Sequence, residues 1–119
     1  MRLRTVTFER FAVVRVPFPF TDRDAVKNRP ALVLSASGNF NAAAGHSVMA
    51  MITSAGNPGW PLDCLIDDLV SAGLPVPSMV RFKLFTLDHR LVRGQIGALS
   101  PGDCERVRRS LAQLLGEAG

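Results

Sequence analysis

The sequence predicts a mainly β fold, a small barrel-like sheet of short strands capped by one C-terminal helix. Three observations support this prediction: short apolar segments recur along the chain, turn signals separate them at close intervals, and one amphipathic helical pattern ends the sequence. The chain has 119 residues, of which 47% are hydrophobic. That is enough for a single compact domain over residues 1–119 and too few for two.

The first two strands flank a polar loop. Residues 11–18 are almost wholly apolar and predict a buried strand, which Pro17 and Pro19 end because proline cannot donate to a sheet ladder. Residues 21–28 are polar and charged and predict a loop. The Leu- and Val-rich residues 30–35 predict the second strand.

The middle of the chain alternates strands with turns. Residues 37–45 contain Gly, Asn and an Ala run, and they predict a connection or one short helical turn. Residues 47–53 predict the third strand, and the Gly-Asn-Pro-Gly sequence at 56–59 predicts a turn. A short strand is predicted at 62–66 and a helical turn at 68–73. Two further strands are predicted at 78–85 and 91–99, with a turn near Asp88 and His89.

The C-terminal helix has the clearest signal. Ser100 is a suitable N-cap, Pro101 fits the first helical position, and Asp103 gives a start that resembles a capping box. Apolar residues then recur at helical spacing, and we expect them to pack in the core. They are Cys104, Val107, Leu111, Leu114 and Leu115.

The charge balance favours an anionic partner. The net charge is +4, and nucleic acid is the commonest partner of a small basic domain. The alternative is a solvated basic surface, because Arg106, Arg108 and Arg109 are expected on the exposed side of the helix. No apolar run is long enough to span a bilayer, and residues 1–10 lack a signal-peptide core, so we expect a cytoplasmic protein without membrane contact.

The cysteines and histidines do not form a metal-binding pattern. Cys64 and Cys104 are far apart and belong to no CxxC pair, and His46 and His89 do not join them at ligand spacing. We therefore expect reduced thiols, with Cys104 in the core, and neither a metal nor another cofactor.

Two positions are candidates for holding a phosphate. Pro30 biases Arg29 toward extended backbone at the start of a strand, where a guanidinium can clamp a phosphate with two parallel hydrogen bonds. The alternative is an ordinary surface arginine that closes a loop. Thr53 and Ser54 end a strand with adjacent hydroxyls, which suit a phosphate oxygen but are also common at strand ends.

Cations and aromatic residues supply further candidates. Arg81 and Lys83 lie two apart on a predicted strand and so share a face. A cation within an apolar strand must find an anion or reach water, and this also holds for Arg15. Cations beside phenylalanines can bind single-stranded RNA, because the cations contact phosphates and the rings stack on bases. The alternative is that the rings belong to the core. This second group comprises Arg23 and Lys27 with Phe18 and Phe20.

Taken in order, seven segments make the chain resemble the PemK/MazF family of bacterial toxins. No single segment is decisive, but their ordered sum is specific, and it runs from about residue 11 into the C-terminal helix. The segments are VVRVPFPFTD at 13–22, RPALVLS at 29–35, MITS at 51–54, AGLP at 72–75, PSMVR at 77–81, KLFTLD at 83–88 and IGALS at 96–100.

The resemblance implies an SH3-like barrel with short helices, in the type shared by PemK, MazF and CcdB toxins, and usually a homodimer. It implies a metal-independent endoribonuclease that cuts single-stranded RNA at short motifs, and a cognate antitoxin protein as partner. The family's catalytic residues fall on Arg29, Thr53 and Arg81. Where one branch has an acidic residue this chain has Lys83, which leaves the general base unassigned. The expected RNA-binding residues are Phe18, Pro19, Thr21, Arg23, Lys27, Asn28, Ser54, Ser78 and Lys83.

Two other functions remain open at this point. CcdB toxins share the fold, bind gyrase and cut nothing, so the fold alone does not decide between a nuclease and a non-catalytic toxin acting on gyrase and DNA. A third alternative is an inactive relative with a regulatory role. The matches at Arg29 and Thr53 favour the nuclease, and the missing carboxylate favours the binding protein.

Overall fold

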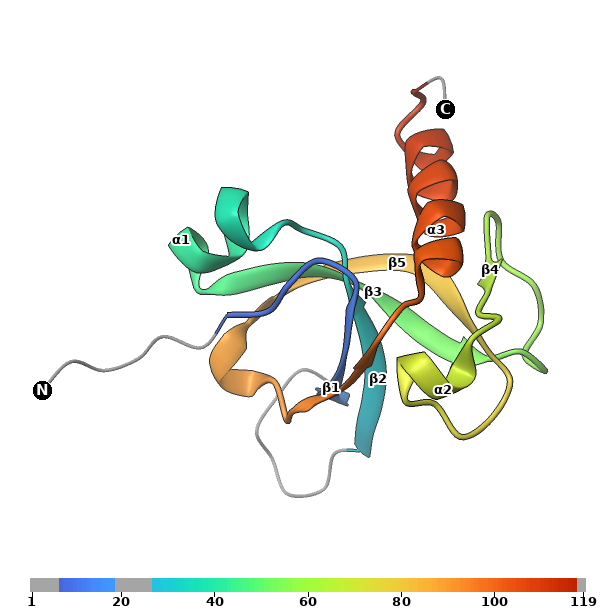
Figure 1. The fold of residues 1–119 in the computed structure, drawn as a ribbon, viewed down its shortest axis with the longest axis horizontal. Coiled ribbons are helices and arrows are strands. Elements are labelled where there is room, and N and C mark those ends of the chain that lie inside the picture. The colour runs from blue at the N-terminus through green and yellow to red at the C-terminus, as the bar shows by residue number, and fades with distance from the viewer. Residues whose placement is uncertain (1–6, 19–26, 118–119) are drawn as a thin grey trace, which may run out of the picture.

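An antiparallel sheet with strand order β4-β5-β3-β2-β1-β6 dominates the computed structural model, which describes residues 7–18 and 27–117. The sheet curls, and α3 lies against one of its faces (Figure 1). This arrangement confirms the predicted mainly β, barrel-like fold with a C-terminal helix. The strands are β1 (Ala12–Phe18), β2 (Lys27–Val33), β3 (His46–Ser54), β4 (Cys64–Leu65), β5 (Ser78–Asp88) and β6 (Gln95–Ala98).

The helical segments are short except for the last. None of them, within the part of the chain that the structure describes, is long and apolar enough to cross a membrane. A connection or one short helical turn was predicted at 37–45 and a helical turn at 68–73, and the structure has helical segments in both places. The segments are η1 (Ser37–Asn41), α1 (Ala42–Ala44), α2 (Leu69–Ala72), η2 (His89–Leu91) and α3 (Pro101–Leu114).

Strand ends follow the pairing partners more closely than the local sequence. Lys27 and Asn28 were expected in the loop, but they belong to β2 because they pair with Phe18 and Pro17 of β1. The rest of the predicted loop, residues 21–26, lies outside the described residues. The same cause shortens the strand predicted at 62–66 to β4, whose two residues pair only with one end of β5.

The predicted strands at 78–85 and 91–99 needed a larger correction. β5 continues to Asp88 because β3 pairs with it along its whole length, as far as His46 opposite Asp88. The turn that follows is η2, where the Asp88 side chain accepts the backbone N–H of Arg90. β6 therefore begins only at Gln95, where pairing with β1 starts.

The sheet carries an apolar cluster on each face, since side chains alternate along a strand. The first cluster includes Val13, Leu32 and Ile52, and it packs against Cys104 and Val107 of α3. The second cluster is built from the intervening positions of the same strands, including Val14, Ala31, Val33 and Met49. Residues 29, 51 and 53 share the parity of this second cluster, so β2 and β3 direct them to the second face.

Helix α3 begins as predicted but extends past the core. Ser100 caps it, and Cys104 and Val107 are buried. Leu114 and Leu115 were expected in the core, yet they are 40% and 63% exposed. Figure 1 shows the reason, because the last turns of α3 project beyond the sheet.

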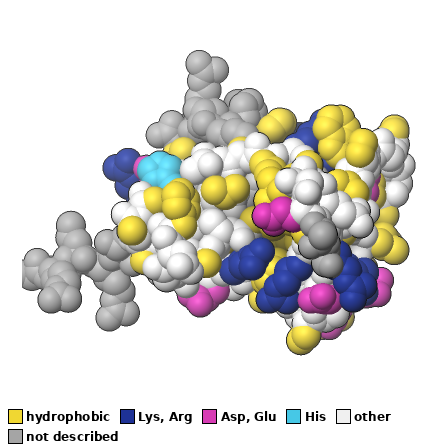
Figure 2. All heavy atoms as spheres, turned by 90° about the horizontal axis from the view of Figure 1, so that it is seen from above, with side chains coloured by type: hydrophobic (Ala, Val, Ile, Leu, Met, Phe, Trp, Pro, Cys, Tyr) yellow, Lys and Arg dark blue, Asp and Glu magenta, His cyan; other side chains and the backbone are white. Residues whose placement is uncertain are grey.

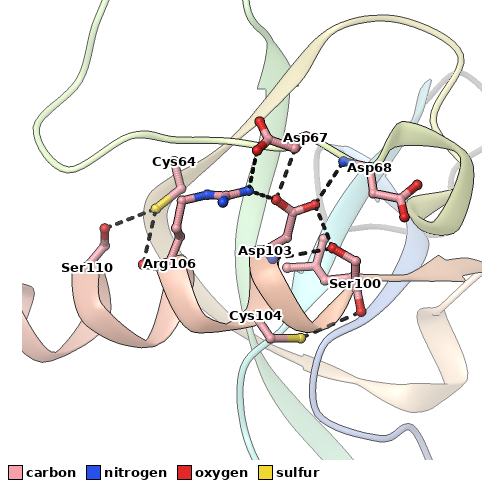
Figure 3. A network of polar contacts seen from close by, with 9 residues as sticks. Cys64, Asp67, Asp68, Ser100, Asp103, Cys104, Arg106 and Ser110 are labelled. Carbon is pink, nitrogen blue, oxygen red and sulfur yellow. Dashed lines mark hydrogen bonds and ion pairs between the residues drawn. The ribbon is translucent and has the colours of Figure 1, made fainter.

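Asp103 ties α3 to the turn that precedes α2 (Figure 3). The side chain is buried, and its carboxylate accepts hydrogen bonds from the backbone N–H groups of Asp67 at 3.1 Å and Asp68 at 3.0 Å. Arg106 and Ser100 donate to the same carboxylate. Burial alone would raise the pKa of Asp103, but these donors together outweigh it and hold the pKa below its ordinary value of 3.8.

Replacing Asp103 with alanine is expected to destabilise the fold by about 1–3 kcal/mol, because two backbone N–H groups lose their buried acceptor. A depressed pKa contributes stability above the unfolded-state pKa, and this stability is lost as the pH falls through the folded-state value. The difference in unfolding free energy between wild type and Asp103→Ala should therefore shrink below about pH 4. Urea unfolding at neutral and acidic pH measures it, and a pH-independent difference would contradict the role of the charge.

Helix α2 and strand β6 meet at two glycines. A Cβ on Gly97 would lie 2.4 Å from the carbonyl carbon of Ala72, and one on Gly73 would lie 2.0 Å from the carbonyl oxygen of Ile96. Gly73 also has a φ of 72°, which favours glycine. The contact is therefore backbone against backbone, and no side chain fits between the two segments.

Candidate active site

A cleft of about 360 Å³ opens on the second face of the sheet, where β2, β3 and β5 run side by side. Three cationic side chains border it, and its described lining includes no carboxylate. That balance suits an anionic ligand. The lining residues are Phe18, Arg29, Met51, Ile52, Thr53, Arg81, Lys83, Leu84 and Phe85.

Arg29 is an exposed cation of this cleft. Pairing places it opposite Val16 of β1, and its guanidinium carbon lies 5.5 Å from the centre of the Phe18 ring. Within the described residues it forms no ion pair with a carboxylate. The Phe18 ring orients the planar guanidinium of Arg29, and the N–H groups of the guanidinium remain available to donate to a ligand.

Thr53 lies near the end of β3 with its hydroxyl already oriented. The side-chain amide of Asn57 donates to Thr53 Oγ1 at 2.5 Å. The hydroxyl accepts this bond, so its own proton can be donated to a second acceptor such as a phosphate oxygen. Its neighbour Ser54 is exposed, and its Oγ accepts from the backbone N–H of Gly56 at 3.4 Å.

Arg81 is paired with a carboxylate that comes from a different segment. It lies opposite Met51 beside a bulge between β3 and β5. Its Nε donates to Asp63 Oδ1 at 3.2 Å, and its Nη2 donates to Asp63 Oδ2 at 2.9 Å and to the carbonyl of Pro58 at 2.5 Å. The hydrogen bond from Arg81 lowers the pKa of Asp63, and the same bond raises the pKa of Arg81, so both groups are ionised at neutral pH.

Lys83 meets the loop that Arg81 holds. Its ammonium lies 4.5 Å from the centre of the Trp60 ring, a cation–π contact. Trp60 is 44% exposed, so much of the ring faces solvent beside the cleft. The residues between β3 and β4 thus bring an aromatic side chain to the rim of the cationic site.

A sequence model of a protein family matches residues 9–115, nearly the whole chain, and its description is PemK-like, MazF-like toxin of type II toxin-antitoxin system. The chain belongs to this family. The resemblance inferred from the sequence is thereby confirmed. No curated protein matches the chain by sequence.

Solved structures share the toxin fold. MazF of Deinococcus radiodurans has 27% identity and a TM-score of 0.71, over 93% of this chain and 98% of that one. A MazE–MazF complex of the same organism has 23% identity and a TM-score of 0.73, over 95% and 100%. An endoribonuclease in complex with its cognate antitoxin, from a mycobacterial species, has 18% identity and a TM-score of 0.72, over 95% and 97%.

The fold brings together the residues that the sequence placed in the catalytic set. Arg29, Thr53 and Arg81 all border the cleft of this toxin-family chain, as do Phe18 and Lys83. Phe18 is 42% exposed and is therefore not a core residue. Lys27, Asn28 and Ser54 are exposed on strands but do not line the cleft. The predicted RNA-binding residues Pro19, Thr21 and Arg23 lie outside the described residues.

Ser78 has a different position from the one expected. It is buried, and its hydroxyl donates to the carbonyl of Val76 at 2.8 Å, which fixes the turn into β5. The side chain does not line the cleft. A small hydroxyl residue at a strand end is as often a turn former as a ligand contact, and here it acts as a turn former.

Two cleft-rim residues were missed by sequence reasoning. Asp63 reaches Arg81 across 18 positions of sequence, and no periodicity or motif encodes that contact. Trp60 did carry a signal, because it is the only tryptophan of the chain and stands in a Gly- and Pro-rich turn region. A large aromatic residue in such a region is a candidate for ligand contact.

The arginines of α3 are paired with acidic residues. Arg106 contacts Asp67 and Asp103, and Glu105 lies within 3.6 Å of Arg108 and 3.5 Å of Arg109. Figure 2 looks onto the molecule from above, where basic and acidic side chains lie intermixed. The arginines of α3 therefore form a solvated ion-pair surface, whereas Arg29 and Lys83 of the cleft have no carboxylate partner among the described residues.

Proposed function

We propose that this protein is the toxin of a type II toxin–antitoxin system, a cytoplasmic endoribonuclease that cuts single-stranded RNA without a metal ion or other cofactor. One observation carries the proposal: Arg29, with no carboxylate partner among the described residues, and Thr53, with a hydroxyl proton to donate, border one cationic cleft in a chain of the PemK/MazF family. The Arg29 guanidinium can donate two parallel hydrogen bonds to a phosphate, and the Thr53 hydroxyl can donate one more.

The proposed reaction is an attack within the RNA strand. The 2′-oxygen adjacent to the scissile phosphate loses its proton and attacks phosphorus in line, and the bond to the 5′-oxygen breaks. The products are a cyclic phosphate and a 5′-hydroxyl, whose oxygen takes up a proton. Arg29 neutralises the charge that develops on the non-bridging oxygens, and Thr53 donates to one of them.

Arg81 has two roles in this proposal. Its charge adds to the positive field at the cleft, and its hydrogen bonds to Asp63 and Pro58 hold the loop that forms the rim. Asp63 is thus a positioning residue. Its lowered pKa makes it a weak proton acceptor, so we do not assign it as the general base.

Replacing Asp63 with alanine is expected to lower cleavage by about tenfold to a hundredfold, because Arg81 and the loop lose their fixed geometry. Asp63→Asn retains an acceptor for one hydrogen bond and should lose less. Steady-state cleavage of an RNA oligonucleotide measures the effect. Asp67→Ala is the matched control, because Asp67 is an exposed carboxylate that pairs with Arg106 of α3 and does not line the cleft. Equal rates for wild type and Asp63→Ala would contradict the positioning role.

The remaining predicted contacts form a path for the RNA strand. Phe18 and Lys83 border the cleft, and Lys27, Asn28 and Ser54 are exposed strand residues close in sequence to Arg29 and Thr53. Pro19, Thr21 and Arg23, which stand between β1 and β2 in the sequence, are kept as proposed RNA contacts. Ser78 has its hydroxyl bound to the protein and receives no RNA contact in this proposal.

The proposal extends to protein partners. The complexes of MazF with MazE and of an endoribonuclease with its antitoxin support a cognate antitoxin that inhibits this chain. By analogy with the family we also propose a homodimer of single-domain subunits. Copurification with the product of the adjacent reading frame and light scattering test these two points.

The direct test is to incubate the purified protein with long single-stranded RNA in EDTA and to map the product ends. The proposal predicts discrete cuts with 5′-hydroxyl ends and growth arrest with loss of RNA on expression. Growth arrest with intact RNA and damaged DNA would instead identify a poison of the gyrase type. Absence of both cutting and arrest in a folded protein would indicate an inactive relative.

A further inference from the structure

We infer that Trp60 is a base-stacking residue, on which a nucleobase flanking the phosphate in the cleft lies when RNA is bound. The inference rests on the proposed function and adds to it a recognition element outside the catalytic residues. Base-on-aromatic stacking supplies affinity for single strands and accepts every base, with preferences set by stacking strength.

The segment that carries Trp60 is held in place from both sides by one residue of the cleft. Arg81 donates to the carbonyl of Pro58, two residues before Trp60, and to the carboxylate of Asp63, three residues after it. The same carboxylate accepts the backbone N–H of Trp60 at 2.9 Å, and the backbone N–H of Asp63 donates to the Trp60 carbonyl at 3.2 Å. The ring is therefore presented from a fixed backbone, which reduces the entropy lost on binding.

The ring itself lies between a cation and solvent. Lys83, which lines the cleft, places its ammonium against the ring, and 44% of Trp60 remains exposed. An ammonium beside an accessible indole can contact a phosphate, while the flat face of the indole can stack on a neighbouring base of the same RNA strand. The nearest carboxylate bonded to this segment, Asp63, is neutralised by Arg81, so the local charge does not oppose RNA.

Nucleic acid fits this surface better than an apolar protein segment does. The cleft residue in contact with the Trp60 ring is Lys83, which is cationic, and the cationic Arg81 holds the same segment through Pro58 and Asp63. Phe40 offers a comparison, since it is similarly exposed at 39% and has no cation–π contact among the described residues. Phe40 precedes β3 in the chain and Trp60 follows it. The nine residues of β3 span about 30 Å, so the two aromatic residues belong to opposite ends of that strand.

The sequence provides its own optical probe for the test. Trp60 is the only tryptophan and the chain has no tyrosine, so the indole emission of the protein reports on this ring alone. A short randomised 2′-O-methyl RNA is the ligand, because it lacks the attacking hydroxyl and stays intact. A fluorescein label on the strand gives binding by anisotropy, independently of the indole signal.

We expect saturable quenching of Trp60 by this RNA and little quenching by an abasic strand of equal length. In Trp60→Ala the dissociation constant should rise about fivefold to a hundredfold, the loss equivalent to one stacked base. Trp60→Phe should recover part of this loss, and Phe40→Ala should bind as wild type does. Circular dichroism of each variant verifies folding.

Two results would overturn the inference while leaving the proposed function intact. The first is RNA binding by anisotropy, together with cleavage of natural RNA, without a change in Trp60 emission or with equal quenching by the abasic strand. The second is an emission change with the copurified antitoxin only, which would assign the ring to a protein partner. If no RNA binds and natural RNA is not cut, the proposed function fails and the stacking role fails with it.

Discussion

Replacing Arg29 with alanine is expected to reduce RNA cleavage by about a hundredfold to a thousandfold, the usual loss when one preorganised donor to a developing charge is removed. The side chain is exposed and forms no ion pair among the described residues, so the fold should be unaffected. Cleavage rates under single-turnover conditions measure the loss. Arg29→Lys should recover little, because an ammonium cannot form two parallel hydrogen bonds to a phosphate.

Arg15 supplies the matched control for this experiment. It is exposed on β1 and pairs with Pro30, the neighbour of Arg29, but its parity directs it to the opposite face of the sheet. Arg15→Ala removes the same charge without changing the cleft and should cut RNA as wild type does. Equal losses in the two variants would assign the effect to net charge and refute the specific role of Arg29.

Replacing Gly97 with alanine is expected to destabilise the fold by about 3 kcal/mol, at the upper end of the cost of overpacking. The added methyl group would lie 2.4 Å from the backbone of α2, and neither backbone can move without breaking the contact between α2 and β6. Urea unfolding measures the change.

Gly102→Ala is the control for that substitution. A Cβ at Gly102 meets nothing within 4 Å, and the residue lies in α3, where alanine is the better helix former. Its stability should equal or slightly exceed that of wild type. A loss of similar size in both variants would show that the close approach of α2 and β6 is not the cause.

The parts of the fold that local sequence determines were predictable. The N-cap of α3 at Ser100, the helical turn that ends at Gly73 and the apolar segments of β1 to β3 all depend on neighbouring residues. The exact strand ends were not predictable, since the length of β5 depends on β3 and that of β4 on β5. The exposure of Leu114 and Leu115 depends on where the sheet stops.

The candidate site divides in the same way. Arg29 and Thr53 could be found from the sequence because each is fixed by a strand position and by family segments. Asp63 could not, because its role arises from a contact between a loop and a strand that only the folded chain creates. Lys83 stands where one branch of the family has an acidic residue, but Arg81 still has a carboxylate partner. That partner is Asp63, which comes from another segment.

The two-sided sheet has a consequence for how such a protein can change over generations. Arg29 and Thr53 stand in strands whose adjacent residues build the core, so shifting either one by a single position would exchange buried and exposed faces. Trp60 stands outside the ladder, on a segment where most substitutions leave the core untouched. Mutation of the segment around Trp60 can therefore change which RNA sequences are bound. Arg29 and Thr53, the groups proposed for the bond-breaking step, meanwhile keep the positions that β2 and β3 give them.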